Sequence, residues 1–241
     1  MMQGLLVRQE LYLGVRVYLN EIFISRRDTN INNRKREFQV KSKKRLLREY
    51  AEAIITALIL ALIIRTYVIQ AFKIPSGSMI PTLLIGDHIL VNKFIYGTKI
   101  PFTDRRVLVF KKPKKEDIIV FKYPVDPKKD FIKRVVATEG DVIEERDKIV
   151  YVNRKAVSEP YAQHFDKTVR SGGIDLRDSF RPLIIPNGKV FVMGDNRDQS
   201  YDSRYWGFVD SKEIRGKALI IYWSWDPNNS VRFSRIGRLL H

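Results

Sequence analysis

The sequence predicts a mainly β fold, with a single N-terminal transmembrane helix followed by an antiparallel, barrel-like or sandwich-like β domain that carries a small loop-rich subdomain. The helix is predicted from residues 53–64, a run of twelve uncharged residues that is apolar on every side. The β domain is predicted because the chain changes after residue 88 to short β-branched and aromatic runs, separated by Gly, Pro, Asp and Asn. No helical periodicity lies between these runs, which disfavours a parallel sheet built with helical crossovers.

The composition narrows the possible functions. The chain is 44% apolar and 11% aromatic, enough for a packed core. Its net charge of +17 suggests a nucleic acid or an anionic membrane as a partner. The absence of cysteine excludes disulfides, thiolate catalysis and Cys-ligated zinc. With only His88, His164 and His241, a site with several histidine ligands is disfavoured, and we predict neither metal nor cofactor.

The N-terminal quarter is predicted to be a basic tail and a membrane anchor. Twelve uncharged residues alone are too few to span a bilayer and would favour a buried helix or a signal-peptide core. However, Arg65 can extend its charge toward the interface, so the span can continue through Ile69. Basic residues between Lys41 and Arg48 form a cytoplasmic flank, and no Ala-x-Ala-like cleavage site follows. We therefore predict a cytoplasmic tail over residues 1–49, an uncleaved anchor over 50–70 and an extracytoplasmic domain over 71–241.

Eight runs in the C-terminal part predict strands. They cover residues 88–94, 105–110, 117–123, 131–138, 141–146, 148–153, 189–195 and 217–223. Residues 154–188 are rich in Ser, Gly, Asp and Arg, which predicts a reduced, loop-rich insertion or subdomain.

A short turn after the predicted anchor is the first candidate for chemistry. In "PSGSMIP", Ser76 and Ser78 flank a glycine, and Pro75 and Pro81 restrict the turn on both sides. This arrangement suits an exposed serine nucleophile, although a plain structural turn has the same composition.

A serine nucleophile needs a base, and none of the histidines has a suggestive setting. The alternative is a lysine kept neutral by burial. In the predicted strand "DFIKRVVATEGD", Lys133 and Arg134 point to opposite faces, and either could point inward. Only lysine can be deprotonated at ordinary pH, so Lys133 is the candidate base. The alternative is a lysine exposed on an edge strand.

The stretch "MGDNRDQSYDSRYWGFV", residues 193–209, concentrates polar residues after a predicted strand. Asp195, Asp198 and Asp202 are oxygen ligands of the kind that calcium prefers. The spacing of a helix–loop–helix calcium site is missing, and Arg197 and Arg204 lie among the acids. An ion-paired scaffold fits better than a metal site.

The anchor and these three motifs, in this order, closely resemble the bacterial type I signal peptidases (leader peptidases), membrane-bound serine proteases of the Ser-Lys type. The resemblance extends from about Ala51 to the C-terminal "SRIG". It implies that Ser78 is the nucleophile and Lys133 its general base. It further implies an oxyanion hole formed by the Ser78 N–H and the Ser76 hydroxyl, and a hydrogen bond from Ser200 to the Lys133 ammonium.

The resemblance also implies supporting and substrate-binding residues. Asp202 and Arg204 would brace the catalytic loop. The small pocket for the residue before the scissile bond would be lined by Ile74, Met79, Leu83, Phe131 and Ile132.

The implied function is removal of N-terminal signal peptides from secreted preproteins at the extracytoplasmic face of the cell membrane. Preproteins and membrane lipid would be the partners. A specialised processing peptidase with a narrow substrate set is the alternative. A self-cleaving, DNA-binding repressor is disfavoured because residues 1–50 contain no helix-turn-helix pattern, so no nucleic-acid partner is expected. An inert binding module is disfavoured because every expected catalytic residue is present.

Overall fold

A computed structural model describes residues 44–99, 106–107, 110–170, 175–226 and 230–240. The chain divides into two units, residues 1–61 and 62–241. Most of the predicted basic tail lies outside the described residues, and the predicted domain division stays a prediction.

Residues 44–63 are α-helical and exposed on every side. Two ion pairs on this helix, Arg45–Glu49 at 3.0 Å and Arg48–Glu52 at 2.7 Å, have the i,i+4 spacing that supports a helix. A π-helical turn, η1 (Ile64–Val68), follows, and β1 (Ile69–Lys73) begins directly after it. Ile69 and Gln70, the last residues of the predicted anchor, therefore belong to a strand. Within the described ranges, no helix combines the length and the apolar character needed to cross a membrane.

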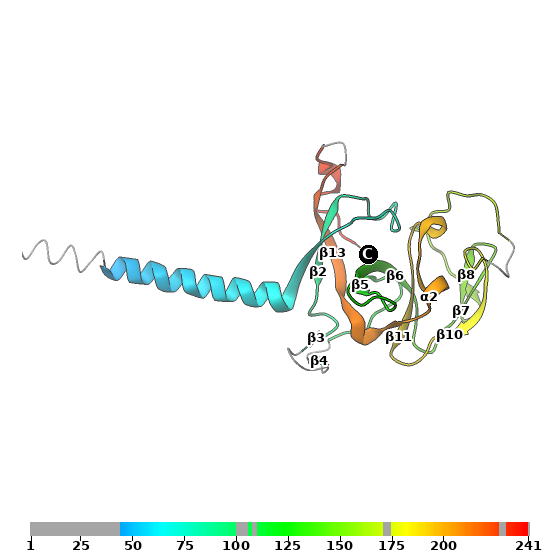
Figure 1. Cartoon of the computed structure of the whole chain (residues 1–241), viewed down its shortest axis with the longest axis horizontal. Coiled ribbons are helices and arrows are strands. Elements are labelled where there is room, and N and C mark those ends of the chain that lie inside the picture. The colour runs from blue at the N-terminus through cyan, green and yellow to red at the C-terminus, as the bar shows by residue number, and fades with distance from the viewer. Residues whose placement is uncertain (1–43, 100–105, 108–109, 171–174, 227–229, 241) are drawn as a thin grey trace, which may run out of the picture. The chain divides into compact units, whose positions relative to one another are not determined.

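The second unit is built on antiparallel sheets, which confirms the mainly β prediction (Figure 1). The main sheet has seven strands in the order β1-β2-β13-β5-β6-β11-β12. Besides β1, its strands are β2 (Asp87–Asn92), β5 (Ile118–Lys122), β6 (Asp130–Thr138), β11 (Lys189–Met193), β12 (Val209–Asp210) and β13 (Ile214–Ser224).

A second sheet, of four strands in the order β10-β7-β8-β9, forms the small subdomain. Its strands are β7 (Val142–Arg146), β8 (Ile149–Val152), β9 (Lys155–Ala156) and β10 (Phe180–Ile184). Two of the predicted strand runs, at 141–146 and 148–153, lie in this sheet rather than in the main one, whereas the predicted bounds 154–188 of the loop-rich subdomain stay a prediction.

The remaining elements are short. They are the paired strands β3 (Thr98–Lys99) and β4 (Arg106–Val107), the 3-10 turns η2 (Arg197–Gln199), η3 (Ser211–Glu213) and η4 (Phe233–Arg235), and the helical turn α2 (Ser203–Trp206).

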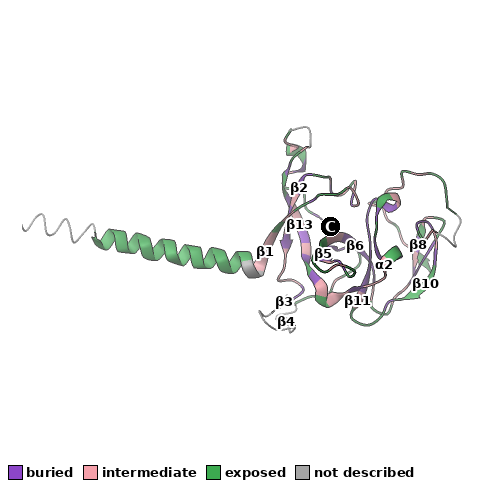
Figure 2. Ribbon diagram, in the orientation of Figure 1, coloured by how far each residue is buried: buried purple, intermediate pink, exposed green. Residues whose placement is uncertain are grey.

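The central strands of the main sheet are buried on both faces (Figure 2). On β5, Ile118 and Val120 belong to one core cluster, whereas Ile119 and Phe121 belong to another. On β6, Ile132 packs against the first of these clusters and Phe131 and Val135 against the second, so its side chains also meet protein on both faces. Because β6 is buried on both faces, the candidate base Lys133 is surrounded by protein.

Candidate active site

The turn that carries Ser78 connects β1 to β2 and is fixed by its apolar neighbours. Met79 and Leu83 are both 0% exposed and pack in the same core cluster. The Leu83 N–H donates to the Met79 carbonyl at 2.9 Å, which closes the turn. Ser78, directly before Met79, stays half-buried, so its hydroxyl is held at the edge of the core.

Lys133 on β6 reaches this hydroxyl. Its Nζ donates to Ser78 Oγ at 2.5 Å, across 55 positions of sequence. Lys133 is only 4% exposed, and this burial lowers its pKa from the usual 10.5 to about 8. The carboxylates of Asp202 and Asp195 oppose this shift, and the Arg204 guanidinium supports it. A serine in contact with a lysine that deprotonates near neutral pH has the chemistry of a nucleophile and its base.

Lys133 and Arg134 are both buried, so the expectation that one of the two cations points outward is wrong. Arg134 lies on the opposite face of β6 and donates to both carboxylate oxygens of Asp195, at 2.9 and 2.7 Å. Thr82, four residues after Ser78, donates its hydroxyl to the same carboxylate at 2.5 Å. The Arg134–Asp195 ion pair, together with the Thr82 hydrogen bond, thereby connects the end of the Ser78 turn to β6. The sequence analysis named Arg134 only as an alternative to Lys133 and missed Thr82.

The chain after β11 packs directly against the Ser78 turn. The Asn196 N–H donates to the Ser78 carbonyl at 3.1 Å, and the Asn196 side chain donates to the Gly77 carbonyl at 3.1 Å. A Cβ on Gly194 would lie 2.4 Å from the Ser78 carbonyl oxygen and 2.2 Å from Ser200 Oγ. Only glycine allows this approach.

Ser200 lies in the expected loop, next to Gly194, but does not make the expected contact. Its Oγ is buried and forms no hydrogen bond of good geometry within the described part of the chain, although it lies close enough to Asp202 to help hold the pKa of that carboxyl down. The predicted hydrogen bond between Ser200 and the Lys133 ammonium is therefore not formed in this structure.

Asp202 and Arg204, which were predicted to brace the catalytic loop, form an ion pair with each other. The guanidinium of Arg204 donates to both carboxylate oxygens of Asp202, each at 2.9 Å. Asp202 also accepts the Gly194 N–H at 3.0 Å, which holds the glycine that contacts the Ser78 turn. Burial alone would raise the pKa of Asp202, but the charge and hydrogen bonds of Arg204 hold it below its usual value.

A second buried ion pair braces the other end of the turn. Arg235, in the C-terminal "SRIG", donates to both oxygens of Asp87, with Nη2–Oδ2 at 2.6 Å, and to the Thr82 carbonyl at 2.9 Å. Asp87 also accepts the Leu84 N–H at 2.8 Å. Burial alone would raise the pKa of Asp87, but the bond from Arg235 holds it below its usual value. Neither Asp87 nor Arg235 was singled out from the sequence.

The predicted pocket residues are divided between two clusters. Ile74, Met79 and Leu83 belong to one buried cluster, against which Ile132 packs. Phe131 packs instead against the cluster on the other face of the sheet, with its ring stacked on Tyr123 at a centroid distance of 4.3 Å. Phe131 and Ile132 are half-buried, so they are the members of the set nearest to solvent.

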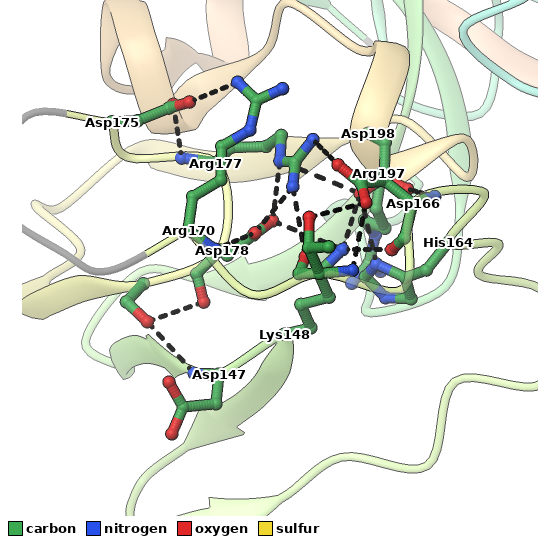
Figure 3. A network of polar contacts seen from close by, with 12 residues as sticks. Asp147, Lys148, His164, Asp166, Arg170, Asp175, Arg177, Asp178, Arg197 and Asp198 are labelled. Atoms are coloured by element: carbon green, nitrogen blue, oxygen red, sulfur yellow. Dashed lines mark hydrogen bonds and ion pairs between the residues drawn. The ribbon is translucent and has the colours of Figure 1, made fainter.

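The acids of the 193–209 stretch are matched with cations rather than gathered for a metal. Asp198 contacts Lys148 at 3.1 Å and Arg177 at 3.9 Å, as Figure 3 illustrates. Asp195 forms an ion pair with Arg134, and Asp202 forms one with Arg204. Across the described ranges, no group of three or more His, Asp or Glu side chains could hold a metal ion. The expectation that the site needs no metal or cofactor stays a prediction.

Comparison with known proteins agrees with these motifs. The family described as "Signal peptidase, peptidase S26" matches residues 47–223. The chain is 37% identical to "Signal peptidase I" of Pseudomonas aeruginosa, over 81% of this chain and 80% of that protein. It is 34% identical to "Signal peptidase I" of Buchnera aphidicola over 90% of each chain, and 36% identical to that of Bacillus licheniformis over 79% of this chain and 95% of the relative. The chain therefore belongs to the signal peptidase family, peptidase S26.

Proposed function

We propose that this chain is a membrane-bound serine endopeptidase that removes N-terminal signal peptides from secreted preproteins by Ser-Lys acyl transfer. The observation that carries the proposal is the 2.5 Å contact between Ser78 Oγ and the buried Lys133 Nζ. The names of the relatives support the choice of substrate.

In the first half of the proposed reaction, the neutral amine of Lys133 takes the hydroxyl proton while Ser78 Oγ attacks the carbonyl carbon of the scissile peptide. The resulting ammonium then gives that proton to the departing nitrogen, and an acyl ester on Ser78 remains. In the second half, Lys133 takes a proton from water, the hydroxide attacks the ester, and the proton returns to Ser78. No other titratable group is needed.

The oxyanion formed in each half needs hydrogen-bond donors. The Ser78 N–H and the Ser76 hydroxyl make no hydrogen bond within the described part of the chain, so both are available. Ser76 is exposed and lies two residues before the nucleophile. Donors of this kind stabilise the tetrahedral intermediate by several kcal/mol, on the order of 3 kcal/mol for one donor.

Unpaired strand edges offer a place for an extended substrate. β1 pairs only with β2 and forms an edge of the main sheet. On β6, residues 130–133 pair with β5, but β11 pairs only from Arg134 onward, so the first half of β6 also has one unpaired edge. A substrate could add to these edges by main-chain hydrogen bonds next to Ser78. The dense packing of Met79 and Leu83 would favour small residues before the scissile bond.

The proposed membrane attachment rests on the helix before β1. Between residues 54 and 64 the large apolar side chains, such as Ile54, Leu58 and Leu62, are all between 47% and 66% exposed. Such a surface is favourable in contact with lipid or with other protein. The proposed orientation, with the basic tail in the cytoplasm and residues 71–241 outside, rests on the charge of that tail.

The test is cleavage of a preprotein with an Ala-x-Ala site by the detergent-solubilised full chain, beside Ser78→Ala and Lys133→Ala. We expect cleavage to rise with pH through about 8, because Lys133 is the base only when neutral. Neither variant should cleave. Full activity in Lys133→Ala would refute the dyad. If the wild type cleaves only a few of a panel of preproteins, the narrow-range peptidase is the better description.

A further inference from the structure

Glu145 on β7 is a buried acid that the proposed mechanism does not use. It is 1% exposed, and neither of its carboxylate oxygens has a hydrogen-bond partner within the described ranges. Its strand neighbours across the sheet, Phe180 and Val150, carry no charge. An ionised carboxylate without donors is costly to bury, so a purely structural reason for an acid at this position is missing.

The one cation that lies within ion-pair distance of the Glu145 carboxylate, among the described residues, is Arg204. The distance from Glu145 Oε2 to Arg204 Nη1 is 4.0 Å, and both side chains are fully buried. Arg204 donates through its other edge to Asp202, and through Nη1 and Nη2 to the carbonyls of Arg177 and Arg197. Arg204 therefore lies between two carboxylates, only one of which is hydrogen-bonded to it.

Asp202 connects this arrangement to the base. Its carboxylate accepts the N–H of Gly194, the residue that contacts the Ser78 carbonyl. The charges of Asp202 and Arg204 both act on Lys133. Two buried residues, Arg204 and Asp202, thus connect Glu145 to the Lys133 amine.

We propose that Glu145 is a positioning residue that acts through Arg204 and Asp202 to set the proton affinity of Lys133. The proposal rests on the proposed Ser-Lys function. When Glu145 is ionised, it attracts the Arg204 guanidinium and adds negative charge to the network, which favours the protonated lysine. When Glu145 is protonated, both effects are lost.

The surroundings of Glu145 place this change in the working pH range. Burial raises the pKa of Glu145 to about 7, against the attraction of Arg204 and Arg197, and Asp202 and Glu159 add to the rise. These four groups, from η2, α2 with its preceding residue and the loop after β9, are the charged groups that act most strongly on the Glu145 carboxyl. Because Lys133 titrates about one unit higher, Glu145 is ionised over most of the range in which the base becomes active.

The test is the pH profile of kcat for the full-length enzyme and for Glu145→Gln, which carries no charge at any pH. We expect the midpoint of the acid limb to move down by about half a pH unit in the variant, a gain of about twofold relative to its own plateau near pH 7.5. Below about pH 6 the two profiles should converge, because wild-type Glu145 is then also neutral. A loss of structure would lower the rate at every pH without moving the limb.

The matched control is Glu144→Gln. Glu144 is the neighbouring buried acid on β7, but its carboxylate accepts two bonds from Arg146, at 3.0 and 2.7 Å, away from Arg204. The acid limb of the kcat profile of Glu144→Gln should match that of the wild type. An active wild type and a folded Glu145→Gln variant with identical limbs would overturn the proposal, whereas an inactive wild type would instead refute the proposed function.

If Glu145→Gln does not fold, the proposal is tested on the wild-type enzyme instead. The enzyme labelled with 13C at the glutamate carboxyl carbons is titrated by NMR, with Glu145→Asp to assign the Glu145 signal by its loss. A glutamate that titrates close to pH 7 supports the proposal. If every glutamate titrates below about pH 5.5, the acid is always ionised in the working range and the proposal is wrong.

Discussion

Replacing Lys133 by methionine should abolish cleavage and stabilise the protein. At pH 7 the folded chain holds a protonated lysine in a site that lowers its pKa from 10.5 to about 8. Each pKa unit corresponds to about 1.4 kcal/mol, so this burial costs about 3 kcal/mol. Methionine has a similar unbranched shape and no charge, so it fills the site without that cost. It loses the bond to Ser78, worth about 1 kcal/mol, and a net gain of about 2 kcal/mol remains.

The sign of the pH dependence distinguishes this cause from better packing. Between pH 8 and 10.5 the folded wild type binds fewer protons at Lys133 than the unfolded chain does, so the wild type gains stability as pH rises. Below pH 8 the lysine is protonated in both states, and its cost is constant. The advantage of the methionine variant should therefore be full at pH 7 and should shrink by about 2 kcal/mol on going to pH 10.

Guanidinium unfolding of the full chain in detergent, followed by tryptophan fluorescence, measures this difference. All three tryptophans, Trp206, Trp223 and Trp225, lie in the second unit, so the signal reports the catalytic part. The control is Lys128→Met, at an exposed lysine, which should change neither stability nor its pH dependence. A Lys133→Met variant that is less stable than the wild type at pH 7, or whose advantage is equal at pH 7 and 10, would refute the reasoning.

Three further substitutions test the surroundings of the dyad. Gly194→Ala places a Cβ 2.4 Å from the Ser78 carbonyl oxygen, so the Ser78 turn must shift. We therefore expect kcat to fall by about a hundredfold. An unchanged kcat would contradict the close approach of Gly194 to the turn. Asp87→Asn leaves Arg235 buried without its charge partner, and the free energy of unfolding should fall by about 3 kcal/mol, measured by the same denaturation; a change below about 1 kcal/mol would show that the pair is not needed. Ser200→Ala removes a hydroxyl that forms no hydrogen bond of good geometry within the described residues, so the free energy of unfolding should stay within about 0.5 kcal/mol of the wild-type value. If the bond from Ser200 to Lys133 forms only with substrate, kcat should fall at least about tenfold. An unchanged kcat would remove Ser200 from the mechanism.

The sequence predicted the strands well because their signals are local, whereas the catalytic role of the Ser78–Lys133 dyad stays a prediction. Each of the eight predicted runs contains strand residues, and Lys133 was selected by the chemistry of lysine against arginine. β10 was missed because "FRPLI" contains a proline and an arginine and lacks alternation, as an edge strand can. The alternation argument also assumed that β6 has a solvent face, which a strand buried on both sides does not have.

The ion pairs around the turn could not be predicted in the same way. Asp87 and Arg235 are 148 positions apart, and Arg134 and Asp195 are 61 apart. Spacing along the chain says nothing about such pairs, because they depend on which strands the sheet brings together. Their members could be recognised only as charged residues next to motifs, and the surface is the ordinary place for a charged residue.

These pairs explain how a neutral lysine can exist among so many charges. Asp195 and Asp202 both favour the protonated form of Lys133, and if either stood alone it would offset the effect of burial. Each is instead bound by its own arginine, Arg134 or Arg204, in two hydrogen bonds. Arg204 lowers the pKa of Lys133 and thereby offsets part of the effect of the carboxylates, and desolvation remains the largest influence on that pKa. The arginines are thus as necessary to the base as the burial is, since they let the carboxylates position the Ser78 turn without returning the proton to the lysine.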